Sequence, residues 1–91
     1  MLEWDIYEVR PGRTPIVGVN FRNTVKKFSL AKEIDLLIDN SQDRECVRFA
    51  VISDTDVSSV KEFIVEKFPG ATIEKVKGHI KNPVLSAMYC N

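Results

Sequence analysis

The chain has 91 residues, 44% of them hydrophobic, and 13 acidic residues balance 13 lysines and arginines. This length fits one domain spanning residues 1–91. A formal net charge of zero argues against a protein that grips nucleic acid over a long surface, because that task needs a basic excess. No apolar run is long enough to cross a bilayer, and the start has no secretory pattern. These features predict a cytoplasmic protein with neither nucleic acid nor membrane as a partner.

The two cysteines and the single histidine limit the metal and redox chemistry of the chain. Cys46 and Cys90 are far apart, and with only His79 beside them no four-ligand zinc site of thiolates and imidazoles can be assembled. We therefore expect no metal and no other cofactor. A Cys46–Cys90 disulfide is conceivable, but two thiols packed as small apolar groups are favoured in a reducing compartment. His79 is expected at the surface or on a strand edge.

The first part of the chain predicts a strand followed by a helix. Residues 1–10 alternate with a period of two, with Trp4 and Ile6 on the apolar side, which indicates a strand. Residues 11–15 are rich in turn formers. Apolar residues then recur at helical spacing and indicate an amphipathic helix, namely Phe21, Val25, Phe28, Ala31 and Ile34.

The second part predicts a hairpin, a helix and two further strands. Residues 36–38 and 46–52 are β-rich runs on either side of a polar turn. Residues 54–56 offer oxygen-bearing helix caps, and the apolar stripe that follows comprises Val57, Val60, Ile64 and Phe68. Residues 71–80 form a weaker strand pattern, and residues 84–90 predict a short terminal strand.

The order strand, helix, strand, strand, helix, strand predicts a ferredoxin-like α+β sandwich. In this βαββαβ fold two helices pack on one face of an antiparallel sheet, and here a short extra C-terminal strand is expected. Proteins of very different function share the fold, so function has to be argued from the residues of a site.

The most unusual segment runs from Ile16 through Val17, Gly18, Val19, Asn20 and Phe21 to Arg22. It predicts a loop that ends at a helix N-terminus, where unpaired amides and the helix dipole attract anions. Gly18 would let the backbone curl so that successive N–H groups point inward, and Arg22 could hold a phosphoryl group with its guanidinium. The alternative is an ordinary βα turn in which Phe21 anchors the core and Arg22 is solvated.

This segment resembles the acylphosphatase family, whose signature is Gly-Arg/Lys-Val-Gln-Gly-Val-x-Phe-Arg between the first strand and the first helix. The Gly-Val-x-Phe-Arg half is matched by Gly18, Val19, Phe21 and Arg22. Asn40 follows Arg22 at the spacing of the family's catalytic Arg and Asn. Residues 69–76 look like the family's passage from the second helix to the fourth strand, so the resemblance covers about residues 6 to 80.

The resemblance implies hydrolysis of small acyl phosphates to a carboxylate and phosphate, without metal or covalent intermediate. Arg22 and the amides of residues 16–21 would hold the phosphoryl group, and the Asn40 side chain would position the attacking water. Neither group is a strong base, which suits a loose phosphoryl transfer driven by positioning and charge stabilisation. For Asn40 the alternative is ordinary turn chemistry after a strand.

The sequence also departs from the family pattern. In an ungapped alignment Val17 replaces the family's Gln, Pro15 its basic residue and Thr14 its first Gly. Pro15 would remove an amide donor, and Thr14 would resist a positive φ. A second alignment keeps Gly12 and Arg13 as the family's Gly-Arg pair, with a two-residue insertion after them.

Three other functions compete with hydrolysis. An acylphosphatase-like domain without activity could serve as an anion-binding or protein-interaction module. With or without activity, the chain is expected to be a monomer or a weak homodimer. An RNA-recognition module needs aromatic residues on its central strands, and residues 47–51 offer only Phe49. A metal chaperone of this fold needs a Cys-x-x-Cys loop, which the sequence lacks.

Overall fold

The computed structural model describes residues 2–13, 21–39 and 47–81, and the structural statements below concern these ranges. The elements follow the order strand β1 (Trp4–Arg10), helix α1 (Phe21–Ala31), strands β2 (Leu36–Asp39) and β3 (Val47–Ile52), helix α2 (Ser58–Lys67) and strand β4 (Thr72–Ile80). This is the βαββαβ order that the sequence predicts. The terminal strand predicted for residues 84–90 lies outside the described residues, as do Cys46 and Cys90.

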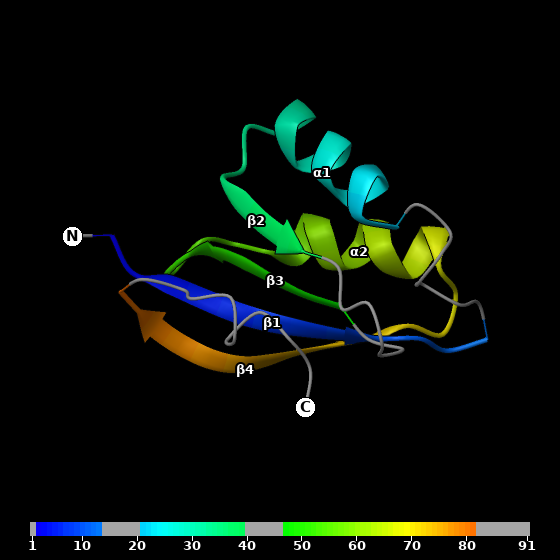
Figure 1. Ribbon diagram of the computed structural model, residues 1–91. Helices are drawn as coiled ribbons and strands as arrows, with labels where there is room; N and C mark the ends of the chain where they lie inside the picture. The colour runs from blue at the N-terminus through cyan, green and yellow to red at the C-terminus, as the bar shows by residue number, and fades with distance from the viewer. Residues whose placement is uncertain (1, 14–20, 40–46, 82–91) are drawn as a thin grey trace.

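The four strands form an antiparallel sheet in the order β2-β3-β1-β4. Both helices lie on the same side of the sheet (Figure 1). The fold is therefore ferredoxin-like, and the predicted fold class is confirmed. Because β1 and β2 both pair antiparallel with β3, they run in the same direction and end at the same end of the sheet.

The main core fills the space between the sheet and the helices. Alternation along β1 sends Tyr7 and Val9 toward the helices, while Ile6 points to the opposite face, as a period of two requires. The rings of Tyr7 and Phe49 stack with centroids 5.3 Å apart. The largest fully buried members of this core are Val9, Val25, Val47, Phe49, Val51, Val60 and Ile64.

Helix α1 is shorter than its apolar spacing predicts. Phe21 and Val25 are buried and Phe28 is half-buried, but Ala31 is exposed and Ile34 lies beyond the helix, so the predicted stripe is wrong at its end. The helix stops because Glu33 adopts a left-handed φ of 59°, which turns the chain back toward the sheet. Ile34 still packs on the core from this connection.

Helix α2 follows its predicted pattern. All four residues of its apolar stripe are buried, from Val57 to Phe68. The N-cap residue is Val57, whose side chain makes no capping hydrogen bond, so the N-cap is none of the predicted residues 54–56. Asp56, one residue earlier, accepts a hydrogen bond from the Ser58 amide at 2.9 Å and so satisfies one unpaired N–H of the first turn.

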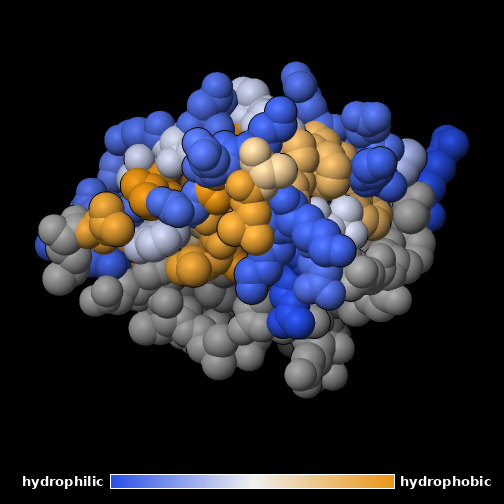
Figure 2. All heavy atoms as spheres, turned by 90° about the horizontal axis from the view of Figure 1, so that it is seen from above, coloured by the Kyte–Doolittle hydropathy of each residue, from blue (hydrophilic) through white to orange (hydrophobic). Residues whose placement is uncertain are grey.

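On the helix side of the molecule, apolar surface gathers in the middle of the face and hydrophilic surface surrounds it (Figure 2). The large apolar side chains that the described residues expose are Leu2, Leu30, Leu37 and Val65. Neither described helix has the length and apolar character needed to cross a bilayer.

Candidate functional site

The structure describes two of the eight predicted site residues, Phe21 and Arg22, which open helix α1. Phe21 is 2% exposed, and its ring packs edge-on against Phe68 with centroids 4.9 Å apart. This contact fixes the start of α1 against the end of α2. Arg22 is the second residue of the helix and is half-buried, and the first turn contains no acidic residue. The positive end of the helix dipole and the guanidinium therefore act together at this point.

The remaining predicted residues cannot be placed. Residues 16–20 of the phosphate-binding loop and Asn40 lie outside the described residues. Thr14 and Pro15 also lie outside the described residues. They stand where the family signature has a glycine and a basic residue, and they bear on the shape of the loop. The structure therefore brings Arg22 and Phe21 together at the helix start and leaves the other predicted contacts untested.

The sheet topology shows at which end of the sheet the described neighbours of the predicted site residues lie. Strand β2 ends at Asp39, one residue before Asn40, and Asp39 pairs with Arg48 near the start of β3. Strand β1 ends at Arg10, which pairs with Thr72 at the start of β4. Since Phe68 shortly precedes Thr72 and contacts Phe21, the start of α1 lies at this same end of the sheet. Figure 1 shows β1 and β2 pointing the same way, toward the start of α1.

The beginning of the β1–α1 connection is held by a close approach of two glycines. A Cβ atom on Gly12 would come within 2.2 Å of the Gly70 backbone, so no other residue fits at position 12 without displacing the chain. Gly70 itself has a φ of 86°, which L-residues rarely adopt. The sequence places both glycines in turn segments and in stretches that resemble the acylphosphatase family, but it does not predict that they touch each other.

A buried ion pair lies at this end of the sheet, on the face without helices. The Glu8 carboxylate accepts a hydrogen bond from Arg48 Nε at 3.0 Å and is 2.7 Å from Arg10 Nη2. Glu8 and Arg48 are directly opposite each other on β1 and β3, and both are buried. The contact between Glu8 and Arg48 favours this register of the two central strands beside the candidate site, because a shift of one residue would move the two side chains to opposite faces of the sheet. Sequence reasoning missed it, although both residues occupy polar positions of predicted strands.

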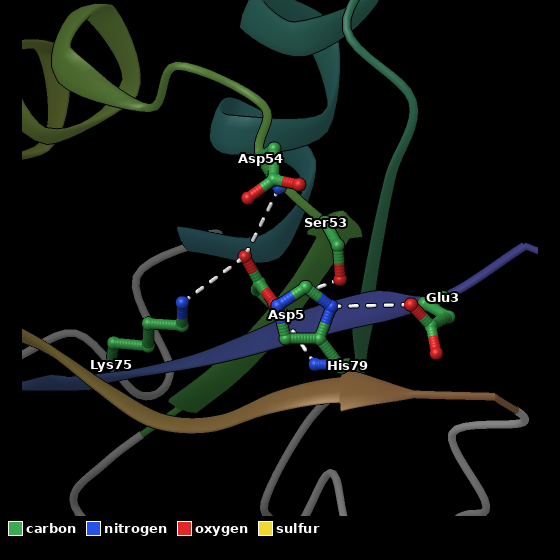
Figure 3. A network of polar contacts seen from close by, with 6 residues as sticks. All are labelled: Glu3, Asp5, Ser53, Asp54, Lys75 and His79. Carbon is green, nitrogen blue, oxygen red and sulfur yellow. Dashed lines mark hydrogen bonds and ion pairs between the residues drawn. The ribbon is translucent and has the colours of Figure 1, made fainter.

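A second carboxylate forms a polar network at the opposite end of the sheet (Figure 3). Asp5 accepts hydrogen bonds from Ser53 Oγ at 2.9 Å and from the amides of Asp54 and His79 at 3.3 and 3.1 Å, and its Oδ2 is 3.3 Å from Lys75 Nζ. Burial of the carboxyl raises its pKa, but these donors lower it by more, so the pKa of Asp5 falls from 3.8 to about 2. Asp5 is therefore ionised at neutral pH, with its oxygens occupied by protein donors.

This network has the properties of a structural anchor. Two of its donors are backbone amides of residues with positive φ, Asp54 at 67° and His79 at 56°. The carboxylate thus ties the start of β1 to the β3–α2 turn and to the end of β4. His79 is exposed, as predicted, and its Nδ1 is 3.2 Å from Glu3 Oε1. Within residues 2–13, 21–39 and 47–81, no group of three His, Cys, Asp or Glu side chains is arranged to hold a metal ion.

Comparisons with known proteins add no family assignment. The chain matches no protein-family model, no curated protein and no solved structure. The fold, with its four-stranded antiparallel sheet and two helices, is compatible with an acylphosphatase-like domain.

Proposed function

We propose that the protein is an acylphosphatase, which hydrolyses the carboxyl-phosphate bond of small acyl phosphates without a metal ion. The observation that carries this proposal is the position of Arg22 in the first turn of α1, at the sheet end where β2 stops one residue before Asn40. Arg22 and the amides of residues 16–21 hold the phosphoryl group, and the Asn40 amide orients the water in line with the leaving carboxylate.

Hydrolysis of an acyl phosphate requires few protein groups beyond this arrangement. In a loose phosphoryl transfer the enzyme supplies charge stabilisation and positioning, and a substrate phosphate oxygen can take the proton of the water. Arg22 supplies a positive charge in the first turn of the helix, next to the positive end of the helix dipole. Orienting the water requires no titratable group at position 40, since the Asn40 amide can both donate and accept hydrogen bonds.

The test is turnover of benzoyl phosphate by the purified chain in the presence of EDTA. We expect Arg22→Ala to lower kcat/KM by roughly 10³-fold and Asn40→Ala by roughly 10²-fold, since each removes a group that acts in the transition state. Lys27→Ala is the matched control, because Lys27 is an exposed cation of the same helix beyond its first turn, and its activity should stay near that of the parent. A folded parent protein that leaves benzoyl phosphate intact would refute the proposal.

A second candidate is an anion-binding or protein-interaction module of the same fold without hydrolytic activity. The observation that favours it is the pair Thr14 and Pro15, which replaces a glycine and an amide donor of the family loop. Titration with inorganic phosphate distinguishes the two. Amide shifts at residues 16–22 without turnover support the module, whereas amide shifts with turnover support the enzyme.

A further inference from the structure

The outer side of helix α1 is basic and carries one large apolar side chain. We call it the α1 face, and its residues are Lys26, Lys27 and Leu30, all of which are exposed. The helix turns by about 100° per residue, so these residues lie opposite Phe21 and Val25, which the helix buries in the core. Figure 1 shows no described element on the side of α1 that points away from the sheet. The α1 face is therefore open to a partner.

The charge of this face is not balanced within the helix. Six of the 13 lysines and arginines fall within residues 9–32, and none of the 13 acidic residues does. No ion pair among residues 2–13, 21–39 and 47–81 involves Lys26 or Lys27, whereas Arg48 and Lys75 each contact a carboxylate there. Two such cations on one side of a helix attract a partner that carries negative charge.

Leu30 adds an apolar contact point to the same face. Its side chain is 73% exposed, more than any other large apolar side chain of the described residues. In projection down the helix axis, Leu30 lies between Lys26 and Lys27, about one turn further along. Protein interfaces combine an apolar centre, which loses its water on binding, with a polar rim. A leucine flanked by two lysines has this arrangement on a small scale.

This combination fits an acidic protein segment better than a membrane or a nucleic acid. An amphipathic helix binds a bilayer by burying its apolar side, but α1 packs that side on the core and leaves one large apolar side chain, Leu30, exposed. Binding to a nucleic-acid backbone needs a longer row of cations, and the chain as a whole has a net charge of zero. A segment with carboxylates around an apolar side chain matches both the lysines and the leucine.

We propose that the α1 face binds an acidic segment of a partner protein. Carboxylates of the segment pair with Lys26 and Lys27, and an apolar side chain of the segment packs on Leu30. Because Lys26 follows Arg22 by four positions, the partner docks about one helical turn away from this predicted site residue. The inference is independent of the proposed hydrolysis of small acyl phosphates, since it involves none of the residues assigned to that reaction.

The test is a titration of the isotope-labelled full chain with a synthetic peptide in which glutamates flank a leucine. We expect amide shifts to concentrate at residues 26–30, and Lys26→Glu to weaken binding by roughly 10-fold, because repulsion replaces attraction. Lys77→Glu is the matched control, since it makes the same charge change at an exposed position of β4, and its affinity should stay within about twofold of the parent. Equal weakening by the two variants would overturn the proposal, because it would indicate attraction by net charge alone, and so would a parent protein that does not bind the peptide.

The apolar contact and the class of partner are tested in the same titration. Leu30→Ser, and replacement of the peptide's leucine by alanine, should each weaken binding by roughly 3- to 10-fold. Unchanged affinity after both changes would overturn the role of Leu30. Tighter binding of phosphatidylserine vesicles or of a single-stranded oligonucleotide at the same amides would overturn the assignment to a protein partner. Shifts at residues 26–30 that grow with protein concentration alone would overturn it as well, because they indicate a second copy of this chain.

Discussion

Strand β1 carries two buried carboxylates, one on each face of the sheet, and the protein neutralises them in different ways. Asp5, on the helix side, takes its hydrogen bonds from two backbone amides, a hydroxyl and one lysine. Glu8, on the face without helices, is held by the guanidinium groups of Arg10 and Arg48. The first carboxylate organises backbone, whereas the second joins side chains of neighbouring strands. A buried acidic residue in this protein can therefore have a structural role without taking part in catalysis.

The largest effect is expected from Asp5→Asn. The amide keeps one acceptor oxygen and turns its NH₂ group toward donors, so backbone N–H groups of Asp54 and His79 compete for one oxygen. We expect a loss of roughly 3 kcal/mol in the free energy of unfolding, measured by urea denaturation at pH 7. Asp35→Asn, at an exposed position, is the control and should change little. A loss below that of Glu8→Gln would reverse the ranking of the two carboxylates.

A smaller effect is expected from Glu8→Gln. The glutamine oxygen can still accept from Arg48 Nε, but the negative charge that the two arginines share is lost, which should cost roughly 2 kcal/mol in the same urea experiment. Glu66→Gln on the exposed side of α2 is the matched control. Unchanged stability would mean that Arg48 is neutralised by another group.

The stability that Asp5 contributes should depend on pH. Because the pKa of Asp5 in the folded protein is about 2, below the 3.8 of the free group, its contribution to stability is present above about pH 4. It is lost as the pH falls from 3.8 toward 2. We therefore expect the parent and the Asp5→Asn variant to converge in stability across this window, as followed by urea unfolding at several pH values. A difference that stays constant down to pH 2 would contradict the lowered pKa.

The smallest effect is expected from His79→Gly, which probes the strained backbone that Asp5 holds. Glycine adopts a φ of 56° without the penalty of a side chain, so the variant should gain roughly 0.5 to 1 kcal/mol. It also loses the exposed contact with Glu3, which is worth little in water. Glu3→Gln measures that loss separately. Destabilisation by His79→Gly beyond the effect of Glu3→Gln would show that the histidine ring, and not its amide, matters.

The sequence predicted much of the fold because its signals are local. Apolar periodicity and β-rich runs indicated the six elements that the structure describes, and Val57, Val60, Ile64 and Phe68 proved to be one buried stripe. Prediction failed at the end of α1, where the left-handed φ of Glu33 ends a helix that Ala31 and Ile34 would otherwise extend. For the candidate site, the sequence located Arg22 in the first turn of a helix, while the roles of Asn40 and residues 16–20 stay predictions.

Local sequence patterns predict the order of elements, the apolar faces and the motif at the start of α1, because each depends on residues a few positions apart. Which distant groups meet becomes clear only in the folded chain. Glu8 and Arg48 are 40 positions apart, and Asp5 and His79 are 74 apart. Such contacts depend on sheet register and chain reversal, which no local pattern encodes. For the same reason the approach of Gly12 to Gly70, which holds the start of the β1–α1 connection, became visible only in the folded chain.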